Sequence, residues 1–155
     1  MRLHEEVEVL RNIPLFANIE PSKLKLLAFT SERLAFQPGQ ALMRQGESGD
    51  SAFVIISGEA DVMVSTPAGP LKVAHYGKNA LAGEIAMLCD VPRTATVTAT
   101  TEVVTLRISK DLFFRLVREF PQMAIEIMRV LASRLEKTNE LLRDTNAKLA
   151  EANKR

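Results

Sequence analysis

Residues 83–95 read GEIAMLCDVPRTA, and this stretch determines how the rest of the chain is interpreted. Gly83 can adopt backbone angles that are closed to other residues, and residues 84–88 are good helix formers for about a turn and a half. The first N–H groups of a helix lack backbone partners and favour an anion. Pro92 stiffens the approach to Arg93, whose guanidinium suits bidentate phosphate binding. The stretch therefore predicts a phosphate site.

Glu84 stands at the start of the same short helix. A carboxylate repels phosphate, so we expect Glu84 to accept a hydrogen bond from a hydroxyl beside the phosphate, as on a ribose. One site would then bind a sugar hydroxyl and a phosphate together. The alternative is a surface turn in which Arg93 and Glu84 are merely solvated.

The stretch resembles the phosphate-binding cassette of the cyclic-nucleotide-binding domain family. The shared pattern is Gly-Glu, apolar residues, a short loop and Pro-Arg-Thr-Ala, with Arg93 nine positions after Glu84. The resemblance implies that Arg93 pairs with the cyclic phosphate and that Glu84 binds the ribose 2′-OH. The backbone N–H groups of Ala86 and Thr94 would complete the phosphate site. This chain has Ala82 where the family usually has an aromatic residue, which predicts looser packing and weaker affinity.

Other candidates for the binding site lie outside the polar part of the cassette. Val62, Ile85 and Val97 are candidates for an apolar wall against the base, although for any one of them a place in the plain core is the favoured interpretation. The full set of predicted ligand-binding residues is Val62, Gly83, Glu84, Ile85, Ala86, Arg93, Thr94, Ala95, Arg134 and Leu135.

Composition excludes several classes of function. The chain has 155 residues, 46% hydrophobic and 25% charged, with a formal net charge of +1, so it fits one globular domain without a strong preference for nucleic acid or membrane surfaces. Cys89 is the single cysteine, which fits a reducing, cytoplasmic compartment and suggests a buried or half-buried filler. His4 and His75 lack the spacing of a metal site, so no metal is expected. The chain also has no P-loop, no dinucleotide fingerprint and no local signature of Ser/His/Asp catalysis, so no cofactor or enzymatic activity is expected.

Residues 31–108 are divided into short apolar runs by glycine and proline, a pattern typical of a β-sandwich or barrel. His75 falls in one of these runs as a strand surface residue. With the family resemblance, this predicts an α+β, mainly β fold: an eight-stranded jelly-roll with N-terminal helices, a short cassette helix and a long C-terminal helix. The expected segments are helices in 1–30, the roll with its cassette in 31–108, and C-terminal helices in 109–155. Seven strands can be placed individually: 34–36, 41–43, 53–56, 60–64, 71–75, 95–99 and 103–108.

Two helices are expected after the roll. Ser109 is a credible N-cap for a helix from Lys110 to Glu119. Pro121 would begin a helix of roughly 30 residues, since no glycine or proline follows it. Arg134 and Leu135 are candidates to cover a bound base. A heptad seam predicts a homodimer, and the alternative is a solvated helix that frays after about residue 140. The seam residues are Met128, Leu131, Leu135, Leu142 and Leu149.

These observations together predict a non-enzymatic sensor that binds cAMP, with cGMP as the alternative, and signals to an unknown protein partner through its C-terminal helix. Two other hypotheses remain open. One is an interaction scaffold with a weakened pocket. The other is the ligand-binding part of a DNA-binding transcription regulator.

Overall fold

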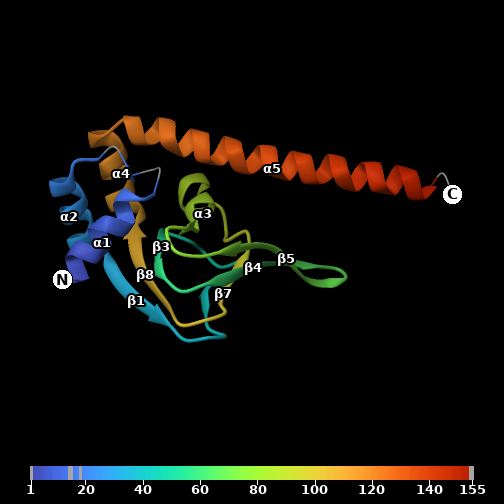
Figure 1. Ribbon diagram of the computed structural model, residues 1–155, viewed down its shortest axis with the longest axis horizontal. Coiled ribbons are helices and arrows are strands. Elements are labelled where there is room, and N and C mark those ends of the chain that lie inside the picture. Colours follow the sequence, from blue (N-terminus) through green and yellow to red (C-terminus); the bar gives the residue numbers. More distant parts are fainter. Residues whose placement is uncertain (1, 14–15, 18, 154–155) are drawn as a thin grey trace.

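The computed structural model describes residues 2–13, 16–17 and 19–153, and it confirms the predicted fold class: two four-stranded antiparallel sheets flanked by helices (Figure 1). The first sheet has the order β1-β8-β3-β6 and the second β2-β7-β4-β5. The strands are β1 (Glu32–Phe36), β2 (Ala41–Met43), β3 (Ser51–Ser57), β4 (Ala60–Thr66), β5 (Gly69–Tyr76), β6 (Leu81–Ala82), β7 (Thr96–Ala99) and β8 (Val103–Ser109). The helices are α1 (Arg2–Arg11), α2 (Pro21–Thr30), α3 (Glu84–Cys89), α4 (Lys110–Glu119) and α5 (Gln122–Asn153).

Strand β3 is buried on both of its faces, which explains why its sequence is an unbroken apolar run instead of an alternating one. Its side chains alternate between two cores. Val54 points to a core that the helices cover, whereas Ile55 points to the interior of the roll. Strand β8 divides in the same way, with Leu106 in the first core and Val103 in the second. The first sheet therefore joins the helices to the roll.

Helices α1, α2 and α4 gather beside the first sheet in Figure 1, and apolar side chains fill the space between them. Leu10, Leu24 and Phe113 are completely buried there. Ser109 caps α4 as predicted, because its hydroxyl accepts a hydrogen bond from the backbone N–H of Leu112 at 3.3 Å. The end of the roll and the start of the C-terminal helices are thus joined without a flexible linker.

The structure differs from the sequence-based expectation in several strand ends, which shift by one or two residues, in one additional strand and in the start of the long helix. Strand β6 was not among the individually placed strands, because two residues between glycine-flanked turns carry too little pattern. Helix α5 begins at Gln122 and not at Pro121, a difference within the usual variation of helix ends. Strand β6 matters for the site, since it pairs with β3 and leads directly into Gly83.

Helix α5 is 32 residues long, and Figure 1 shows its C-terminal part extending well beyond the roll. Leu142 and Leu149 on this part are more than half exposed. Neither α5 nor any other described helix is sufficiently long and apolar to cross a membrane.

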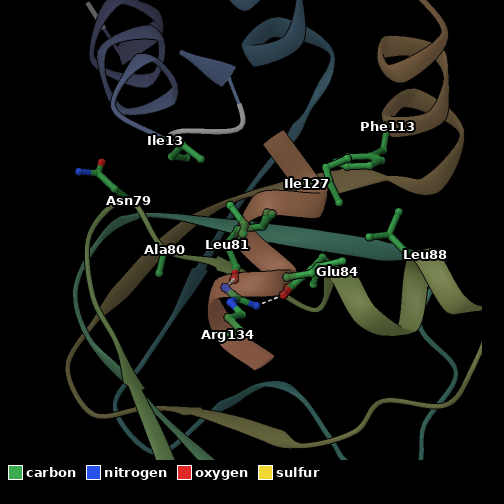
Figure 2. Close-up of a pocket in the computed structure, with 11 residues that line it drawn as sticks. Ile13, Asn79, Ala80, Leu81, Glu84, Leu88, Phe113, Ile127 and Arg134 are labelled. Carbon is green, nitrogen blue, oxygen red and sulfur yellow. Dashed lines mark hydrogen bonds and ion pairs between the residues drawn. The ribbon is translucent and has the colours of Figure 1, made fainter. Parts of the chain in front are cut away.

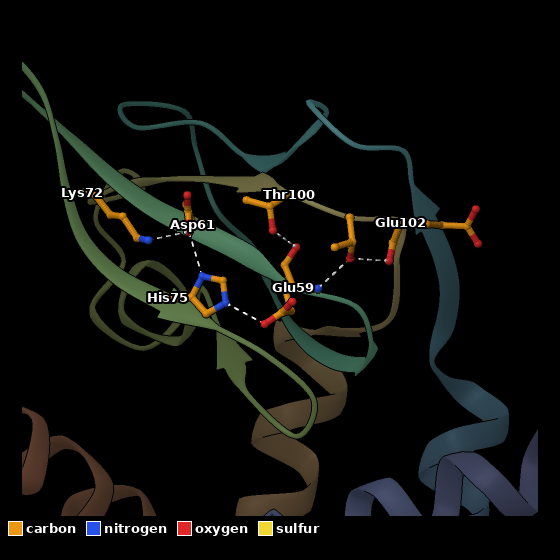
Figure 3. A network of polar contacts seen from close by, with 7 residues as sticks. Glu59, Asp61, Lys72, His75, Thr100 and Glu102 are labelled. Carbon is orange, nitrogen blue, oxygen red and sulfur yellow. Dashed lines mark hydrogen bonds and ion pairs between the residues drawn. The ribbon is translucent and has the colours of Figure 1, made fainter.

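His75 lies on the outer surface of the β4–β5 hairpin, as predicted (Figure 3). Its Nδ1 is 2.8 Å from Asp61 Oδ1 and its Nε2 is 3.0 Å from Glu59 Oε1. Hydrogen bonds first to Asp61 and then to Glu59 raise the pKa of His75 above its ordinary value of 6.5. The hydrogen bond from His75 and, second, the one from Lys72 lower the pKa of Asp61.

The first prediction concerns the pH dependence of stability. Because the pKa of His75 is higher in the folded chain, its stabilising contribution is complete below its ordinary value of 6.5 and disappears as pH rises through the folded pKa. His75→Gln should therefore destabilise the protein more at about pH 6 than at about pH 9. Denaturant unfolding of both proteins across this range measures the difference. A difference that is constant with pH would show that the two carboxylates do not stabilise the imidazolium.

Candidate functional site

The predicted binding residues surround a cavity of about 400 Å³ between the second sheet, α3 and α5, which we call the roll cavity. All of them line it except Leu135. The lining residues are Met43, Val62, Val64, Val73, Ala74, Tyr76, Gly83, Glu84, Ile85, Ala86, Arg93, Thr94, Ala95, Val97, Arg134 and Thr138.

Gly83 allows the chain to turn from β6 into α3. Its φ is 85°, in the left-handed region that other residues avoid. A Cβ at this position would also collide with Nη1 of Arg93. The glycine is therefore required twice, once by the turn and once by the guanidinium beside it.

Arg93 is the centre of the site. Its side chain is buried, with 6% of the residue exposed, and its Nη1 donates to the Gly83 carbonyl at 2.9 Å. Nη2 donates a longer hydrogen bond to Ser51 Oγ at 3.4 Å. Among the described residues, no carboxylate lies within ion-pairing distance of this guanidinium. Burial consequently lowers the pKa of Arg93.

The backbone holds Arg93 in place from both sides. Its N–H donates to the Glu47 carbonyl at 2.8 Å, and its carbonyl accepts from the Gly46 N–H at 2.8 Å. The guanidinium also lies 5.9 Å from the centre of the Phe53 ring. A buried cation that is rigidly placed and lacks a carboxylate partner is a favourable site for an anion.

Glu84 is also buried, and it forms an ion pair with Arg134 of α5 (Figure 2). Its Oε1 accepts no hydrogen bond of regular geometry besides this contact. Arg134 Nη2 donates to the Leu81 carbonyl at 3.1 Å, and its guanidinium lies 5.9 Å from the centre of the Tyr76 ring. Arg134 thus connects the long helix to β6, to the cassette and to β5.

The apolar candidates have different environments. Val62 and Val97 are buried opposite each other on paired strands, so they belong to the core of the roll and also line the cavity. Ile85 is 39% exposed at the mouth. Leu135 is 61% exposed and outside the lining, because one residue along a helix turns the side chain by about 100° from Arg134. Its place over a base therefore stays a prediction for the ligand-bound chain.

Cys89 corrects one expectation, since it is exposed and not buried or half-buried. It is the last residue of α3, and Asp90 directly after it adopts a left-handed conformation that ends the helix. Ala86 and Met87 of the same turn are buried, so the exposure is confined to the side of α3 on which Cys89 lies. No group of three His, Cys, Asp or Glu side chains in the described part of the chain could hold a metal ion.

Reasoning from sequence missed several residues of the site, among them Tyr76 and Gly49. Tyr76 faces the cavity together with Ala74, and the alternation of a strand could have indicated this. Gly49 was taken only as a turn residue, yet its Cα faces Arg93: a Cβ there would lie 2.6 Å from the guanidinium carbon and 2.9 Å from the Ala86 Cβ. No local pattern indicates such a contact between distant segments.

The comparisons with known proteins identify the family. The family model for the cyclic nucleotide-binding domain matches residues 33–120, which include both sheets and the cassette. The chain belongs to the cyclic nucleotide-binding domain family. The matched residues include the buried Arg93, helix α4 and the lining of the roll cavity except Arg134 and Thr138.

Individual relatives are similar over most of this chain. A cAMP-dependent protein kinase regulatory subunit of Colletotrichum orbiculare is 35% identical over 115 residues, 74% of this chain and 28% of that protein. A CRP-like cAMP-activated global transcriptional regulator of Mycobacterium tuberculosis is 30% identical over 138 residues, 88% of this chain and 62% of that protein. The Thermus thermophilus catabolite activator protein is a structural relative with TM-score 0.77 and 25% identity, covering 83% of this chain and 61% of that chain. The chain thus spans less than two thirds of these relatives.

Ala82 is the point where this cyclic nucleotide-binding domain departs from the family pattern. It is completely buried in β6 and pairs with Phe53 of β3. The Phe53 ring packs edge-on against Phe36, with ring centres 6.2 Å apart. An aromatic group therefore still stands beside Arg93, although it comes from the neighbouring strand.

The second prediction tests the close approach of Gly49 to Arg93. Gly49→Ala should displace the guanidinium and destabilise the fold by about 1–3 kcal/mol, as overpacking usually does. Thermal unfolding should show a midpoint lower by roughly 2–4 °C for each kcal/mol. Gly77→Ala is the matched control, because a Cβ there meets nothing within 4 Å. Equal midpoints for the two variants would mean that the Arg93 side chain moves aside without cost.

Proposed function

We propose that this chain is a non-enzymatic sensor that binds cAMP, with cGMP as a tolerated second ligand, in the roll cavity and signals through α5. The observation that carries the proposal is the buried guanidinium of Arg93, which faces this cavity and has no carboxylate partner in the part of the chain that the structure describes. A cyclic phosphate supplies the missing negative charge, and two of its oxygens match the fork of an arginine. Membership in the cyclic nucleotide-binding domain family supports the same ligand class.

Each predicted residue then has a role. Arg93 pairs with the phosphate, and the N–H groups of Ala86 and Thr94 donate to it. Glu84 accepts the ribose 2′-OH. Val62, Ile85 and Val97 form the apolar side of the cavity, and Gly83 and Ala95 leave room for the ligand.

Arg134 provides a link between the cavity and α5. It pairs with Glu84, the same carboxylate that we assign to the ribose. A ribose hydroxyl that binds Glu84 competes with this ion pair, and the released guanidinium can then cover the base beside Tyr76. The helix responds by a population shift, which requires the nucleotide to bind one position of α5 more tightly than the other.

We further propose that α5 is a homodimer seam beyond Thr138 and that the chain acts in the cytoplasm. Leu142 and Leu149 are more than half exposed on the part of α5 that extends beyond the roll. A second copy of the chain would bury them. With a net charge of +1 the chain itself is not expected to bind nucleic acid or a membrane, and we expect its downstream partner to be a protein.

A second candidate function is the ligand-binding part of a transcription regulator. The observation in its favour is the 138-residue similarity to the Mycobacterium tuberculosis regulator, of which this chain covers 62%. The sequence of the complete reading frame tests this directly. The interaction-scaffold hypothesis is less well supported, because Glu84 and Arg93 both line the cavity.

The third prediction is that Arg93 contributes more to the affinity for cAMP than Glu84 does. Arg93→Ala should weaken cAMP binding roughly ten- to a hundredfold, since hydrogen bonds to charged groups contribute about 1.5–3 kcal/mol. Arg93→Lys should restore only part of this, and Glu84→Gln, which keeps an acceptor, should lose less. Calorimetric titrations measure all three against Arg129→Ala, an arginine that is exposed and outside the cavity. Unchanged affinity in Arg93→Ala would disprove the assignment.

The fourth prediction concerns cGMP. Thr94 is exposed at the cavity mouth, where its hydroxyl can reach both the phosphate and the 2-amino group of a syn guanine. We expect cGMP to bind within about tenfold of cAMP, the equivalent of one hydrogen bond. Thr94→Ala should reduce affinity for cGMP more than for cAMP in parallel titrations. Equal losses would indicate that the hydroxyl contacts phosphate alone.

The fifth prediction separates the two parts of α5. Truncation after Asn139 keeps Arg134 and Thr138, so it should give a monomer that binds cAMP. Truncation after Arg118 removes Arg134 and should lose most of the affinity. Light scattering measures the oligomeric state of both truncated proteins, and calorimetry measures their affinity for cAMP. A dimeric longer protein would place the seam elsewhere, and full affinity in the shorter one would exclude a covering role for α5.

A further inference from the structure

A second cavity of about 180 Å³, which we call the helix-side cavity, lies among α3, α4, α5 and β6 (Figure 2). It shares only Glu84 and Arg134 with the roll cavity, so the ion pair between these residues forms a common wall. Its apolar lining comes from Ile13, Ala80, Leu81, Leu88, Phe113, Ile127, Val130 and Leu131.

The size and lining of this cavity match a single aromatic ring. Apolar cavities of about 150 Å³ lined by leucine, isoleucine and phenylalanine remain free of water and bind benzene. The helix-side cavity has a similar volume and the same residue types, with Phe113 at one side in Figure 2. A nucleotide with its charged phosphate does not fit such a lining.

Three polar side chains, those of Asn79, Glu84 and Arg134, interrupt the apolar lining. Asn79 Oδ1 and Glu84 Oε1 are the two buried side-chain polar atoms of the described residues that accept no regular hydrogen bond, and both residues line this one cavity. Glu84 Oε1 pairs with Arg134, whereas Asn79 Oδ1 has no partner among the described residues. The amide of Asn79 can present either an acceptor or a donor by a half-turn about its last bond. A hydroxyl both donates and accepts, so it satisfies either residue.

We propose that the helix-side cavity is a second ligand site, separate from the roll cavity, that takes a monocyclic aromatic alcohol. The ring occupies the space among Leu88, Phe113 and Ile127. The hydroxyl binds at the polar wall, to Glu84 or Asn79.

The test uses the full chain without any nucleotide and phenol as the probe. Nuclear magnetic resonance titration should give saturable shifts for residues of α4 and α5 that line the cavity. Toluene has the same size but no hydroxyl, and we expect it to bind about tenfold more weakly because it lacks one hydrogen bond. Absence of saturable phenol binding would overturn the proposal. Equal affinity for toluene would overturn the assignment of an alcohol.

Variants distinguish this site from the nucleotide site. Val130→Phe fills the helix-side cavity and should abolish phenol binding, while the cAMP titration of the same protein stays within about twofold of wild type and shows that it is folded. Ile127→Phe fills the cavity from a neighbouring turn of α5 and should also abolish phenol binding. It replaces Val130→Phe as the test if that variant does not fold. Arg93→Ala should bind phenol as wild type does, whatever happens to cAMP. Phenol binding that survives both filling variants would contradict the proposal.

Discussion

The structure depends on one unbalanced charge, the buried guanidinium of Arg93. Two backbone hydrogen bonds to residues 46 and 47 fix its position, and Gly49 and Gly83 each lack the Cβ that would occupy its space. A buried cation is costly without an anion, and here the nearest acceptors are the Gly83 carbonyl and the Ser51 hydroxyl, both neutral. The chain therefore keeps a site whose electrostatics improve only when an anion enters the roll cavity.

Helix α5 is connected to this site by a second arginine, Arg134. Arg134 reaches the cassette at Glu84, the Leu81 carbonyl and the Tyr76 ring from a helix that otherwise extends away from the roll. Because Glu84 and Arg134 line both cavities, their ion pair is the point at which the roll, the helices and a bound molecule can influence one another. The proposed sensor needs such a contact, since a helix that touched only the apolar core would not respond to a hydroxyl or a phosphate.

Local sequence patterns predicted those parts of the molecule that local physics determines. The cap at Ser109, the short helix after Gly83 and the strand periodicity are all properties of neighbouring residues, and they are present. The missed features depend on contacts between distant segments. Gly49 touches Arg93 across 44 residues of chain, Cys89 lies on the exposed side of α3, and strand β6 is defined mainly by its pairing with β3. Leu135 shows that a residue can be near a site in sequence and still face solvent.

The most direct test of the central claim is thermal unfolding in the presence of cAMP, with adenosine as the matched ligand that lacks a phosphate. If the cavity accepts a cyclic phosphate at Arg93, the stability should rise continuously with cAMP concentration and gain about 2.7 kcal/mol at 100 times the Kd. Adenosine at the same concentrations should leave the unfolding midpoint nearly unchanged. A midpoint that does not move with cAMP, or that moves equally with adenosine, would contradict the account.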